Sequence, residues 1–381
     1  MKSLLLKNAN IVFPLETRNT SLLIQDGKID RIGERQISAD NVIDLAGANV
    51  LPGFVDIHNH GAIGYDVNNS NSEDLISIGK FLAKHGVTSW LPTLVPDSDA
   101  AYEKTIEAIE KVLALQTGLP IAQIEGIHFE GVFANEEMCG ALRPEYFKSY
   151  SSGSGKIPLP KLTRGVHLTT LAPEIENGIE LIKLLRDEGW IISIGHTKAN
   201  SAILNDAFKA GAHHFTHMFN AMTGLHHREI GVAGWALANE NSTFDIIADG
   251  KHVDPRILKF AARAKSPDLV SLISDSIAPT GLGDGVYRVW GEEIAITKGQ
   301  TQNGRGKIAG SVITLADAVR MMSKLDFSIS EVANMASLNP ARLLGLDNDI
   351  GSIEIGKSAN LAVVDESGNN KLTVINGIIA G

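Results

Sequence analysis

The chain has 381 residues, of which 44% are hydrophobic and 20% are charged, and its 44 acidic and 34 basic side chains give a formal net charge of −10. This length and apolar content suffice for one large domain or two to three ordinary ones, and they exclude disorder as the main state. The acidic balance leaves no extended basic surface for a polyphosphate backbone, which argues against a general nucleic-acid binder.

The sequence carries one cysteine, Cys139, and no long apolar segment. A single cysteine cannot form an intrachain disulfide, which is typical of a reducing compartment. The apolar run at residues 4–6 is too short for a signal peptide before Lys7 interrupts it, and no run approaches the roughly 18 apolar residues of a membrane helix. We therefore expect a cytoplasmic protein without a membrane partner.

Short apolar runs separated by turn residues dominate both ends of the chain. They lie at residues 4–6, 11–13, 22–24 and 29–32 near the start, and at residues 361–364 and 372–375 near the end. This pattern predicts strands and hairpins. Because chain termini often lie close together, we expect residues 1–50 and 346–381 to build one small β domain jointly.

Between these ends, strand-like apolar runs alternate with helix-like segments, the βαβα pattern of a parallel sheet. There are eight such runs, at residues 50–57, 87–94, 124–129, 165–171, 190–194, 213–216, 244–248 and 270–273. Eight strand–helix units over about 250 residues match the size and count of a TIM (β/α)8 barrel. We therefore predict an α/β barrel over residues 51–345, with an open doubly wound sheet as the alternative.

Candidate reactive side chains stand at or just past the carboxyl ends of six of these runs. They are His58 and His60 after the first, Glu130 after the third, His196 after the fifth, His217 after the sixth, His252 after the seventh and Asp275 after the eighth. Barrel enzymes assemble their active sites at this face. Alternation along a strand points His58 and His60 to the same side, so both imidazoles can reach one ion.

Five of these residues are of the type that holds a divalent metal: His58, His60, Glu130, His196 and His217. Imidazole and carboxylate groups suit Zn²⁺ and related ions, and a catalytic site leaves one position for water. The set is enough for one ion or for two that share Glu130, and Asp275 is placed to take a proton from the water. Because a bound ion lowers the pKa of water from about 15.7 towards about 7, the sequence predicts metal-assisted hydrolysis.

Each of these residues also has a purely structural interpretation. A His-x-His pair occurs by chance, a buried Glu130 can be satisfied by pairing, and Asp275 can cap the following loop. These interpretations do not explain why five ligand-type residues and an acid fall on one predicted face. We therefore favour the metal site.

Several blocks of the sequence resemble one enzyme family. Residues 51–60, which read Leu-Pro-Gly-Phe-Val-Asp-Ile-His-Asn-His, resemble the opening of the amidohydrolase superfamily. Blocks similar to N-acetylglucosamine-6-phosphate deacetylases extend over nearly the whole chain, at residues 126–131, 195–197, 216–222, 225–229, 248–253 and 309–311. The string from Thr216 through Glu229 is the most specific of these. The resemblance implies a TIM barrel with a small β-sandwich domain formed by both chain ends.

The resemblance also implies a reaction, the release of acetate from an N-acetyl amino sugar 6-phosphate. The expected substrate is N-acetylglucosamine 6-phosphate. The principal metal ligands would then be Glu130, His196 and His217. His58 and His60 would add a second metal position that some members lack. Zinc is the expected ion, with iron or manganese as alternatives, at one or two ions per subunit. Asp275 would act as general base towards the water and then as general acid towards the leaving amine.

Eight residues are expected around the sugar phosphate on the same resemblance: Ala141, Asn220, Ala221, Arg228, His252, Ile308, Ala309 and Gly310. The planar fork of Arg228 can donate two hydrogen bonds to a phosphate. In family members this arginine comes from the neighbouring subunit. A homodimer is therefore expected.

Three positions depart from the family pattern. Val132 and Ile230 stand where proline is common, and Leu142 stands where the family commonly has histidine. A leucine cannot donate a hydrogen bond, so whatever that histidine contributes to carbonyl or hydroxyl recognition is absent or supplied elsewhere. This keeps N-acetylgalactosamine 6-phosphate open as the substrate.

Two other functions are alternatives. A cyclic-amide hydrolase of the hydantoinase or dihydroorotase type would bridge two metals with a carboxylated lysine at the end of the fourth strand, where residues 169–174 contain no lysine. A metal-free scaffold for oligomeric assembly or ligand sensing should have lost its ligands, yet all five are present together with Asp275.

Overall fold

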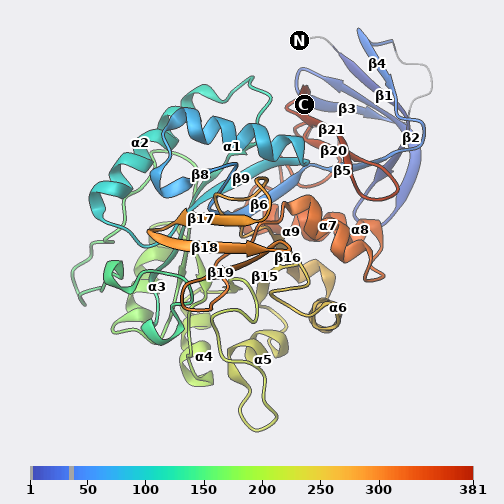
Figure 1. Cartoon of the computed structure of the whole chain (residues 1–381). Coiled ribbons are helices and arrows are strands. Elements are labelled where there is room, and N and C mark those ends of the chain that lie inside the picture. The colour runs from blue at the N-terminus through green and yellow to red at the C-terminus, as the bar shows by residue number, and fades with distance from the viewer. Residues whose placement is uncertain (1–2, 34–37, 381) are drawn as a thin grey trace.

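A barrel of parallel strands forms the body of the molecule in the computed structural model, which describes residues 3–33 and 38–380 (Figure 1). Its strands are β6 (Phe54–Asn59), β9 (Val87–Leu94), β11 (Gly126–Phe133), β12 (Val166–Leu171), β13 (Ile191–Ile194), β14 (His214–Phe215), β15 (Thr243–Ile247) and β16 (Val270–Ile273). Each pairs in parallel with the next, and the short β10 (Gln123–Ile124) lies beside β9 just before β11. This order is that of a TIM barrel.

The barrel closes between its last and first strands just past their carboxyl ends. Asn59 and Ser276 form a parallel bridge. The backbone N–H of Asp275 donates to the His58 carbonyl at 2.9 Å, and that of His60 donates to the Ser276 carbonyl at 2.8 Å. An open doubly wound sheet has no such closing pair, so the barrel prediction is confirmed and the open-sheet alternative is wrong.

Helices surround the barrel and bury its outer face. They are α1 (Ser72–Lys84), α2 (Asp99–Leu115), α3 (Gly178–Asp187), α4 (Ser201–Lys209), α5 (Gly231–Ala238), α6 (Pro255–Lys265), α7 (Leu315–Ser323), α8 (Ile329–Ala333) and α9 (Asn339–Leu344). Several helices begin at a residue whose side chain accepts hydrogen bonds from the free N–H groups of the first turn. Asn71 does this for α1, and the Asp74 side chain accepts the backbone N–H of Asn71 in return. The largest fully buried side chains include Trp90, Tyr102 and Trp190, which pack between strands and helices.

Short helical turns and a small hairpin connect these elements. The turns are η1 (Val67–Asn69), η2 (Glu136–Met138), η3 (Pro144–Tyr146), η4 (Pro267–Leu269) and the π-helical η5 (Asn334–Leu338). β7 (Gly61–Ala62) and β8 (Tyr65–Asp66) form a hairpin directly after β6.

Among the described residues, no helix is both long and apolar enough to cross a membrane.

Both ends of the chain build a second sheet beside the barrel (Figure 1). Its strands are β1 (Leu4–Val12), β2 (Thr17–Gln25), β3 (Lys28–Ile32), β4 (Asn41–Asp44), β5 (Asn49–Pro52), β20 (Leu361–Val364), β21 (Asn370–Ile375) and β22 (Ile378–Ala380). They run in the order β22-β21-β20-β5-β1-β2-β3, with β4 paired to β1. The sheet folds back on itself around a separate apolar core that includes Leu6, Ile24 and Leu361. Lys28 and Ser358, from the two ends of the chain, form an antiparallel β-bridge. The expected small β-sandwich from both chain ends is confirmed.

The predicted run at residues 50–57 is not one strand. It contains most of β5, which belongs to the second sheet, and most of β6, which belongs to the barrel. The chain passes between the two sheets at Gly53, where an added Cβ would lie 2.3 Å from the side chain of Thr88. Only glycine allows this close approach, so one apolar run serves two sheets.

An antiparallel sheet that the sequence pattern did not predict follows the last barrel strand. It consists of β17 (Gly285–Val289), β18 (Glu292–Thr297) and β19 (Gln300–Asn303). These strands lie across the barrel in Figure 1 and alternate buried and exposed side chains, as in the pattern of β18. The insert brings Trp290, Arg305 and Lys307 to the wall of a cavity.

Candidate metal centre and active site

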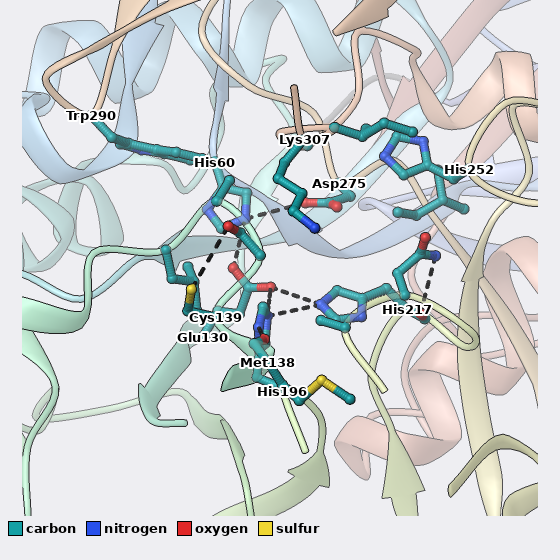
Figure 2. A pocket seen from close by; sticks show the side chains of 18 of the residues that line it. His60, Glu130, Met138, Cys139, His196, His217, His252, Asp275, Trp290 and Lys307 are labelled. Atoms are coloured by element: carbon teal, nitrogen blue, oxygen red, sulfur yellow. Dashed lines mark hydrogen bonds and ion pairs between the residues drawn. The ribbon is translucent and has the colours of Figure 1, made fainter. Parts of the chain in front are cut away.

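Six predicted reactive residues meet at the carboxyl ends of the barrel strands. His58 and His60 come from the end of β6, Glu130 from β11, His196 and His217 from the turns after β13 and β14, and Asp275 from the turn after β16. All six are buried, with exposed fractions between 0 and 6%. Figure 2 shows His60, Glu130, His196, His217 and Asp275 pointing towards one another across a cavity.

Glu130, His196 and His217 form the first of two compact groups. Oε1 of Glu130 lies 3.1 Å from Nε2 of His196 and 3.0 Å from Nε2 of His217, and the two nitrogens are 3.1 Å apart. Ligand atoms at about 2.0–2.1 Å from a shared ion are separated by about 3 Å, so these distances fit a common divalent cation. We call this set the first ligand group.

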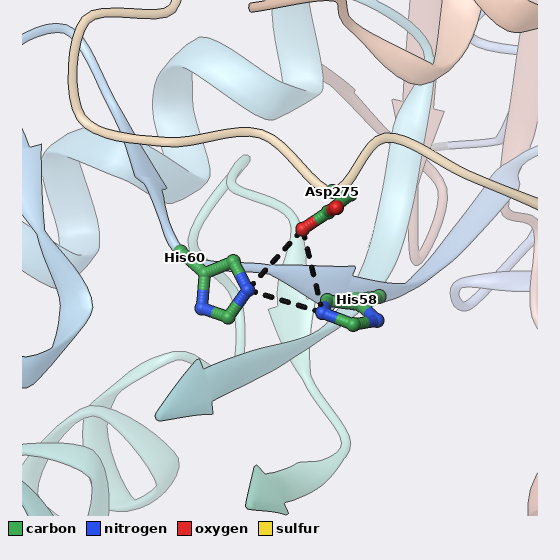
Figure 3. A group of neighbouring side chains, drawn as sticks. All are labelled: His58, His60 and Asp275. Atoms are coloured by element: carbon green, nitrogen blue, oxygen red, sulfur yellow. Dashed lines mark hydrogen bonds and ion pairs between the residues drawn. The ribbon is translucent and has the colours of Figure 1, made fainter. Parts of the chain in front are cut away.

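His58, His60 and Asp275 form the second ligand group (Figure 3). The Nε2 atoms of the two histidines are 3.0 Å apart. Oδ1 of Asp275 lies 3.4 Å from Nε2 of His58 and 3.2 Å from Nε2 of His60. This group again offers two imidazole nitrogens and one carboxylate oxygen within reach of one ion.

Glu130 also touches the second group, so it lies between both. Its Oε1 is 3.4 Å from Nε2 of His58, and its Oε2 is 3.2 Å from Nε2 of His60. One carboxylate can therefore serve two metal positions through its two oxygens. The arrangement matches the sequence-based expectation of one ion or two that share Glu130.

Backbone carbonyls fix the proton positions on two of the histidines. Nδ1 of His60 lies 3.1 Å from the Thr93 carbonyl, and Nδ1 of His196 lies 2.9 Å from the Met138 carbonyl. A carbonyl oxygen only accepts, so each Nδ1 carries a hydrogen and the Nε2 of a neutral ring presents a lone pair. The Nε2 atoms face the oxygens of Glu130, so a proton or a metal cation must lie between nitrogen and oxygen. The donor set therefore fits a metal ion.

The electrostatics of the two carboxylates support the same conclusion. Burial alone would raise the pKa of Glu130, but the charge of His58 and the hydrogen bonds from His196 and His217 lower it well below its usual range. Burial alone would lower the pKa of His60, yet Asp275 and Glu130 raise it to about 10. Both shifts show that the carboxylates demand positive charge here, which a proton or a divalent ion supplies.

Left-handed backbone conformations place three of these side chains. The φ angle is 49° at His196, 33° at His217 and 49° at Asp275. Non-glycine residues rarely adopt such angles, and those that do are concentrated at active sites, where surrounding contacts hold them. The strain here is therefore consistent with a functional constraint on the turns after β13, β14 and β16.

Two acidic residues that the sequence analysis did not identify hold these turns in place. The carboxylate of Asp245 accepts the backbone N–H of His217 and lies 3.1 Å from Nε2 of His214. Glu174 accepts from the Asn135 side chain at 2.9 Å, and the Asn135 N–H donates to the His196 carbonyl at 3.0 Å. Such outer contacts fix the orientation of ligands.

A cavity of about 430 Å³ opens onto the two ligand groups. Six of the eight predicted substrate-binding residues line it: Ala141, Asn220, Ala221, His252, Ile308 and Gly310. Ala309 is fully buried directly beside Ile308 and Gly310. His252 is held by Asp249, whose carboxylate lies 2.7 Å from its Nδ1. The structure thus brings seven of the eight residues to the cavity or its immediate wall.

Arg228 is the predicted substrate-binding residue that the structure places elsewhere. It is exposed, and it is absent from the lining of the cavity as the described residues define it. It lies in the loop before α5, which projects from the body of the molecule (Figure 1). This position is consistent with the expectation that the arginine serves a neighbouring subunit.

Further residues line the cavity, and three of them come from a segment in which no functional residue was predicted. Trp290, Arg305 and Lys307 belong to the β17–β19 insert and the loop after it. Leu142, which stands where the family commonly has histidine, also lines the cavity and is 3% exposed. Its side chain packs over Gly131, where an added Cβ would lie 2.2 Å from its Cδ1. The apolar side chain thus occupies the wall beside Glu130.

Comparisons with known proteins identify the family of the chain. The model of the amidohydrolase family matches residues 49–381. N-acetylglucosamine-6-phosphate deacetylase of Bacillus subtilis (strain 168) is 36% identical over 400 aligned positions, which cover 100% of this chain and 97% of the relative. N-acetylgalactosamine-6-phosphate deacetylase of Escherichia coli O157:H7 is 34% identical over 360 positions, which cover 91% of this chain and 94% of the relative.

Solved structures give the same result. N-acetylglucosamine-6-phosphate deacetylase from Pasteurella multocida superimposes with a TM-score of 0.89 at 26% identity and covers 98% of both chains. A mutant of the Mycobacterium smegmatis enzyme in complex with N-acetyl-D-glucosamine-6-phosphate superimposes with a TM-score of 0.88 at 28% identity and covers 100% of both chains. The chain therefore belongs to the amidohydrolase family and, within it, to the family of N-acetylglucosamine-6-phosphate deacetylases.

Proposed function

We propose that the chain is a metal-dependent hydrolase that removes the acetyl group from N-acetylglucosamine 6-phosphate, giving glucosamine 6-phosphate and acetate. The observation that carries the proposal is the pair of buried ligand groups around Glu130, which face an open cavity. The relatives support the substrate, since several are named N-acetylglucosamine-6-phosphate deacetylase and one solved structure contains that sugar phosphate.

The proposed cofactor is zinc, with iron or manganese as the alternatives. Four imidazoles and two carboxylates are the donor types that zinc prefers, and both ligand groups leave a face open to the cavity. The first ligand group would hold the principal ion. His58 and His60 would hold a second ion where two bind, and Glu130 would then contribute to both positions.

The residues of this chain divide the chemistry between them. A divalent ion supplies hydroxide at neutral pH and draws electron density from the acetamide carbonyl. Asp275 accepts the proton that the attacking water loses, and it later donates that proton to the sugar nitrogen as the carbon–nitrogen bond breaks. Oδ1 of Asp275 lies 3.2 Å from Nε2 of His60, so this carboxylate stands directly beside the ligand groups. Acetate and the free amine are the products.

The sugar phosphate is proposed to lie along Asn220, Ala221, His252 and the backbone at 308–310. Arg305 and Lys307 line the same cavity and add positive charge from the same subunit. Sequence identity does not distinguish the two sugar epimers. The relatives named for the N-acetylglucosamine and N-acetylgalactosamine compounds are 36% and 34% identical to this chain. N-acetylgalactosamine 6-phosphate therefore remains the alternative substrate, and Leu142 adds to that alternative because it cannot donate a hydrogen bond to a hydroxyl.

We also propose a homodimer in which Arg228 reaches the phosphate in the neighbouring subunit. The exposed, projecting loop before α5 supports this assignment, as does the position of Arg228 outside the cavity of its own chain. The bidentate geometry of a guanidinium suits a phosphate.

A cytoplasmic location and a division into two domains complete the proposal. The single Cys139 supports the location, because a chain without disulfides suits a reducing compartment. The separate apolar core of the second sheet supports a small domain of residues 1–50 with 346–381 and a catalytic domain of residues 51–345.

The cyclic-amide hydrolase and the metal-free scaffold have less support. The strand β12 ends at Leu171 without a lysine that could be carboxylated, while Glu130 already contacts both ligand groups. All ligands of both groups are present, which a scaffold would not need.

Substrate kinetics with the purified enzyme test the proposal. We expect the highest kcat/KM with N-acetylglucosamine 6-phosphate, a lower value with its galactosamine epimer, and at least a tenfold loss with the sugar that lacks the phosphate. The Asp275→Asn protein, purified in the same way, is the control for contaminating activity. Equal kcat/KM with and without the 6-phosphate would contradict the proposal, and hydrolysis of dihydroorotate or hydantoin in its place would favour the cyclic-amide alternative.

A further inference from the structure

The turn between β17 and β18 places a tryptophan in a conformation that its side chain disfavours. Val289 pairs with Glu292, so Trp290 and Gly291 form a two-residue hairpin turn. Their φ angles are 51° and 83°. Such turns require a positive φ at both positions and strongly favour asparagine, aspartate or glycine at the first. A tryptophan at this position is therefore not explained by the needs of the turn.

The same insert contains a second turn of this class, which serves as an internal comparison. Lys298 and Gly299 join β18 to β19 with φ angles of 51° and 69°. Here the first residue is exposed, and the carboxylate of Asp284 accepts both backbone N–H groups of the turn at 2.5 and 2.9 Å. The two turns share a geometry but differ in where the first side chain points.

The Trp290 side chain enters the active-site cavity. Its ring lies 5.2 Å from that of His60 at an interplanar angle of 82°, and it lines the cavity. It packs on the apolar clusters that contain Leu142 and Ala141. Its Nε1–H is buried and has no hydrogen-bond partner in the described part of the chain. The positive φ opposes stability, so we infer that the position is held for its function.

Trp290 belongs to an apolar part of the cavity wall, and polar side chains line other parts of it. In Figure 2, Trp290 lies on one side of the ligand groups and His252 on the other, with Glu130 and His217 between them. Leu142 and Ala141 accompany Trp290, whereas polar side chains such as Asn220 and Lys307 also line the cavity. An apolar wall cannot replace the hydration of a phosphate, but it can accept an alkyl group.

We propose that Trp290 bounds the acyl end of the substrate and limits the length of the acyl chain that this enzyme removes. The inference rests on the proposed function, because it concerns the group attached to the amide carbonyl. With the carbonyl at the ligand groups and the phosphate beside Asn220 and His252, of which His252 lies opposite Trp290 in Figure 2, the acyl chain extends towards His60 and the indole. A methyl group fits against this wall, and each added methylene meets the ring.

Kinetics with a series of acyl groups test the inference. N-acetyl-, N-propanoyl- and N-butanoylglucosamine 6-phosphate are compared for the wild type, Trp290→Ala, Trp290→Asn and Lys298→Asn. One methylene in a fitted pocket changes kcat/KM by about 10- to 200-fold. We expect the wild type to prefer acetyl over butanoyl by at least about 10²-fold, and both Trp290 variants to reduce this ratio at least about tenfold.

The two asparagine variants separate the side chain from the turn. Asparagine accepts a positive φ, so Trp290→Asn keeps a favourable hairpin while it removes the indole. Lys298→Asn makes the same change in the other turn and should leave the acyl ratio within twofold of the wild type. A Trp290 variant with an unchanged ratio, or with an equal loss on all three substrates, would overturn the inference. Failure of the wild type to release acetate would instead overturn the proposed function.

Discussion

The sheet at the chain ends and the centre of the barrel are both assembled from segments far apart in the sequence, but they differ in what holds them together. In the sheet, β20 pairs with β5 across more than 300 residues, and the side chains that meet, such as Leu6, Ile24 and Leu361, are apolar. In the barrel centre, by which we mean the two ligand groups at the carboxyl ends of the barrel strands, the side chains that meet are four imidazoles and two carboxylates, and they are buried as well. Apolar burial is favourable by itself, whereas buried charge requires a cation.

This contrast separates stability from activity within one chain. Only Gly53 lies between β5, which belongs to the apolar sheet, and β6, which delivers His58 to the barrel centre. Substitutions in the centre should therefore change metal binding and turnover, while substitutions in the sheet should change the free energy of unfolding. Single substitutions in the two regions, from the largest expected effect on turnover to the smallest, test this division.

Glu130→Gln should cause the largest loss. The substitution removes the carboxylate that both ligand groups share, so we expect less than one equivalent of metal and a fall in kcat of at least about 10³-fold, because hydroxide formation and carbonyl polarisation are lost together. Metal analysis and steady-state kinetics measure this. Glu125→Gln is the matched control, since Glu125 lies in the same segment, accepts from Ser89 at 2.8 Å and stands outside the cavity. Full metal content in Glu130→Gln would contradict the account.

Asp275→Asn should keep the fold and the ion of the first ligand group while kcat falls by at least about 10²-fold, the scale of lost acid–base catalysis. Near-normal turnover of this variant would remove Asp275 from the mechanism. Asp284→Asn is the control, because that carboxylate only binds the turn at Lys298 and Gly299.

Asp245→Asn should weaken metal binding without removing a ligand. Asp245 holds the backbone of His217, and loss of such an outer contact typically lowers metal affinity by about 10- to 100-fold. Competition titration with a chelator of known affinity measures the change, and kcat at saturating metal should recover most of its wild-type value. The exposed Asp206→Asn is the control. An unchanged affinity would show that His217 does not depend on this contact.

Leu361→Ala should have the smallest effect on turnover and a clear effect on stability. Leu361 is fully buried in the core of the second sheet, and truncation of such a side chain costs about 2–5 kcal/mol in the free energy of unfolding. Urea unfolding followed by circular dichroism measures the loss, and kcat/KM should stay within twofold of the wild type. Ile379→Ala, at a side chain that is 45% exposed, should cost under about 1 kcal/mol. A large loss of turnover in Leu361→Ala would break the division between the two regions.

The sequence was most informative where chemistry and periodicity coincide. Each of the eight apolar runs overlaps a barrel strand, because strands buried on both faces of a parallel sheet are largely apolar. The ligand-type residues fall at the strand ends, so their convergence follows from the barrel topology. His252 also follows a strand end and lines the cavity, whereas Asn220, which lines it too, was expected there from the family resemblance.

Features that depend on three-dimensional contact were not visible. The run at residues 50–57 divides between two sheets because Gly53 passes close to Thr88, which no apolar pattern reveals. The carbonyls of Thr93 and Met138, which orient His60 and His196, are backbone atoms and carry no sequence signal. Trp290 reaches the cavity only because the β17–β19 insert folds over it, and a tryptophan in a hairpin turn is unexpected from propensity alone.

Anomalous diffraction from crystals of the purified enzyme tests the central claim most directly. Data collected on both sides of the absorption edges of zinc, iron and manganese would identify any bound ion and its position. The account predicts a peak within about 2.3 Å of Glu130, His196 and His217, with any second peak beside His58 and His60. A fully active enzyme without a peak at these residues, or with Glu130 too far from His196 and His217 to share an ion, would contradict it.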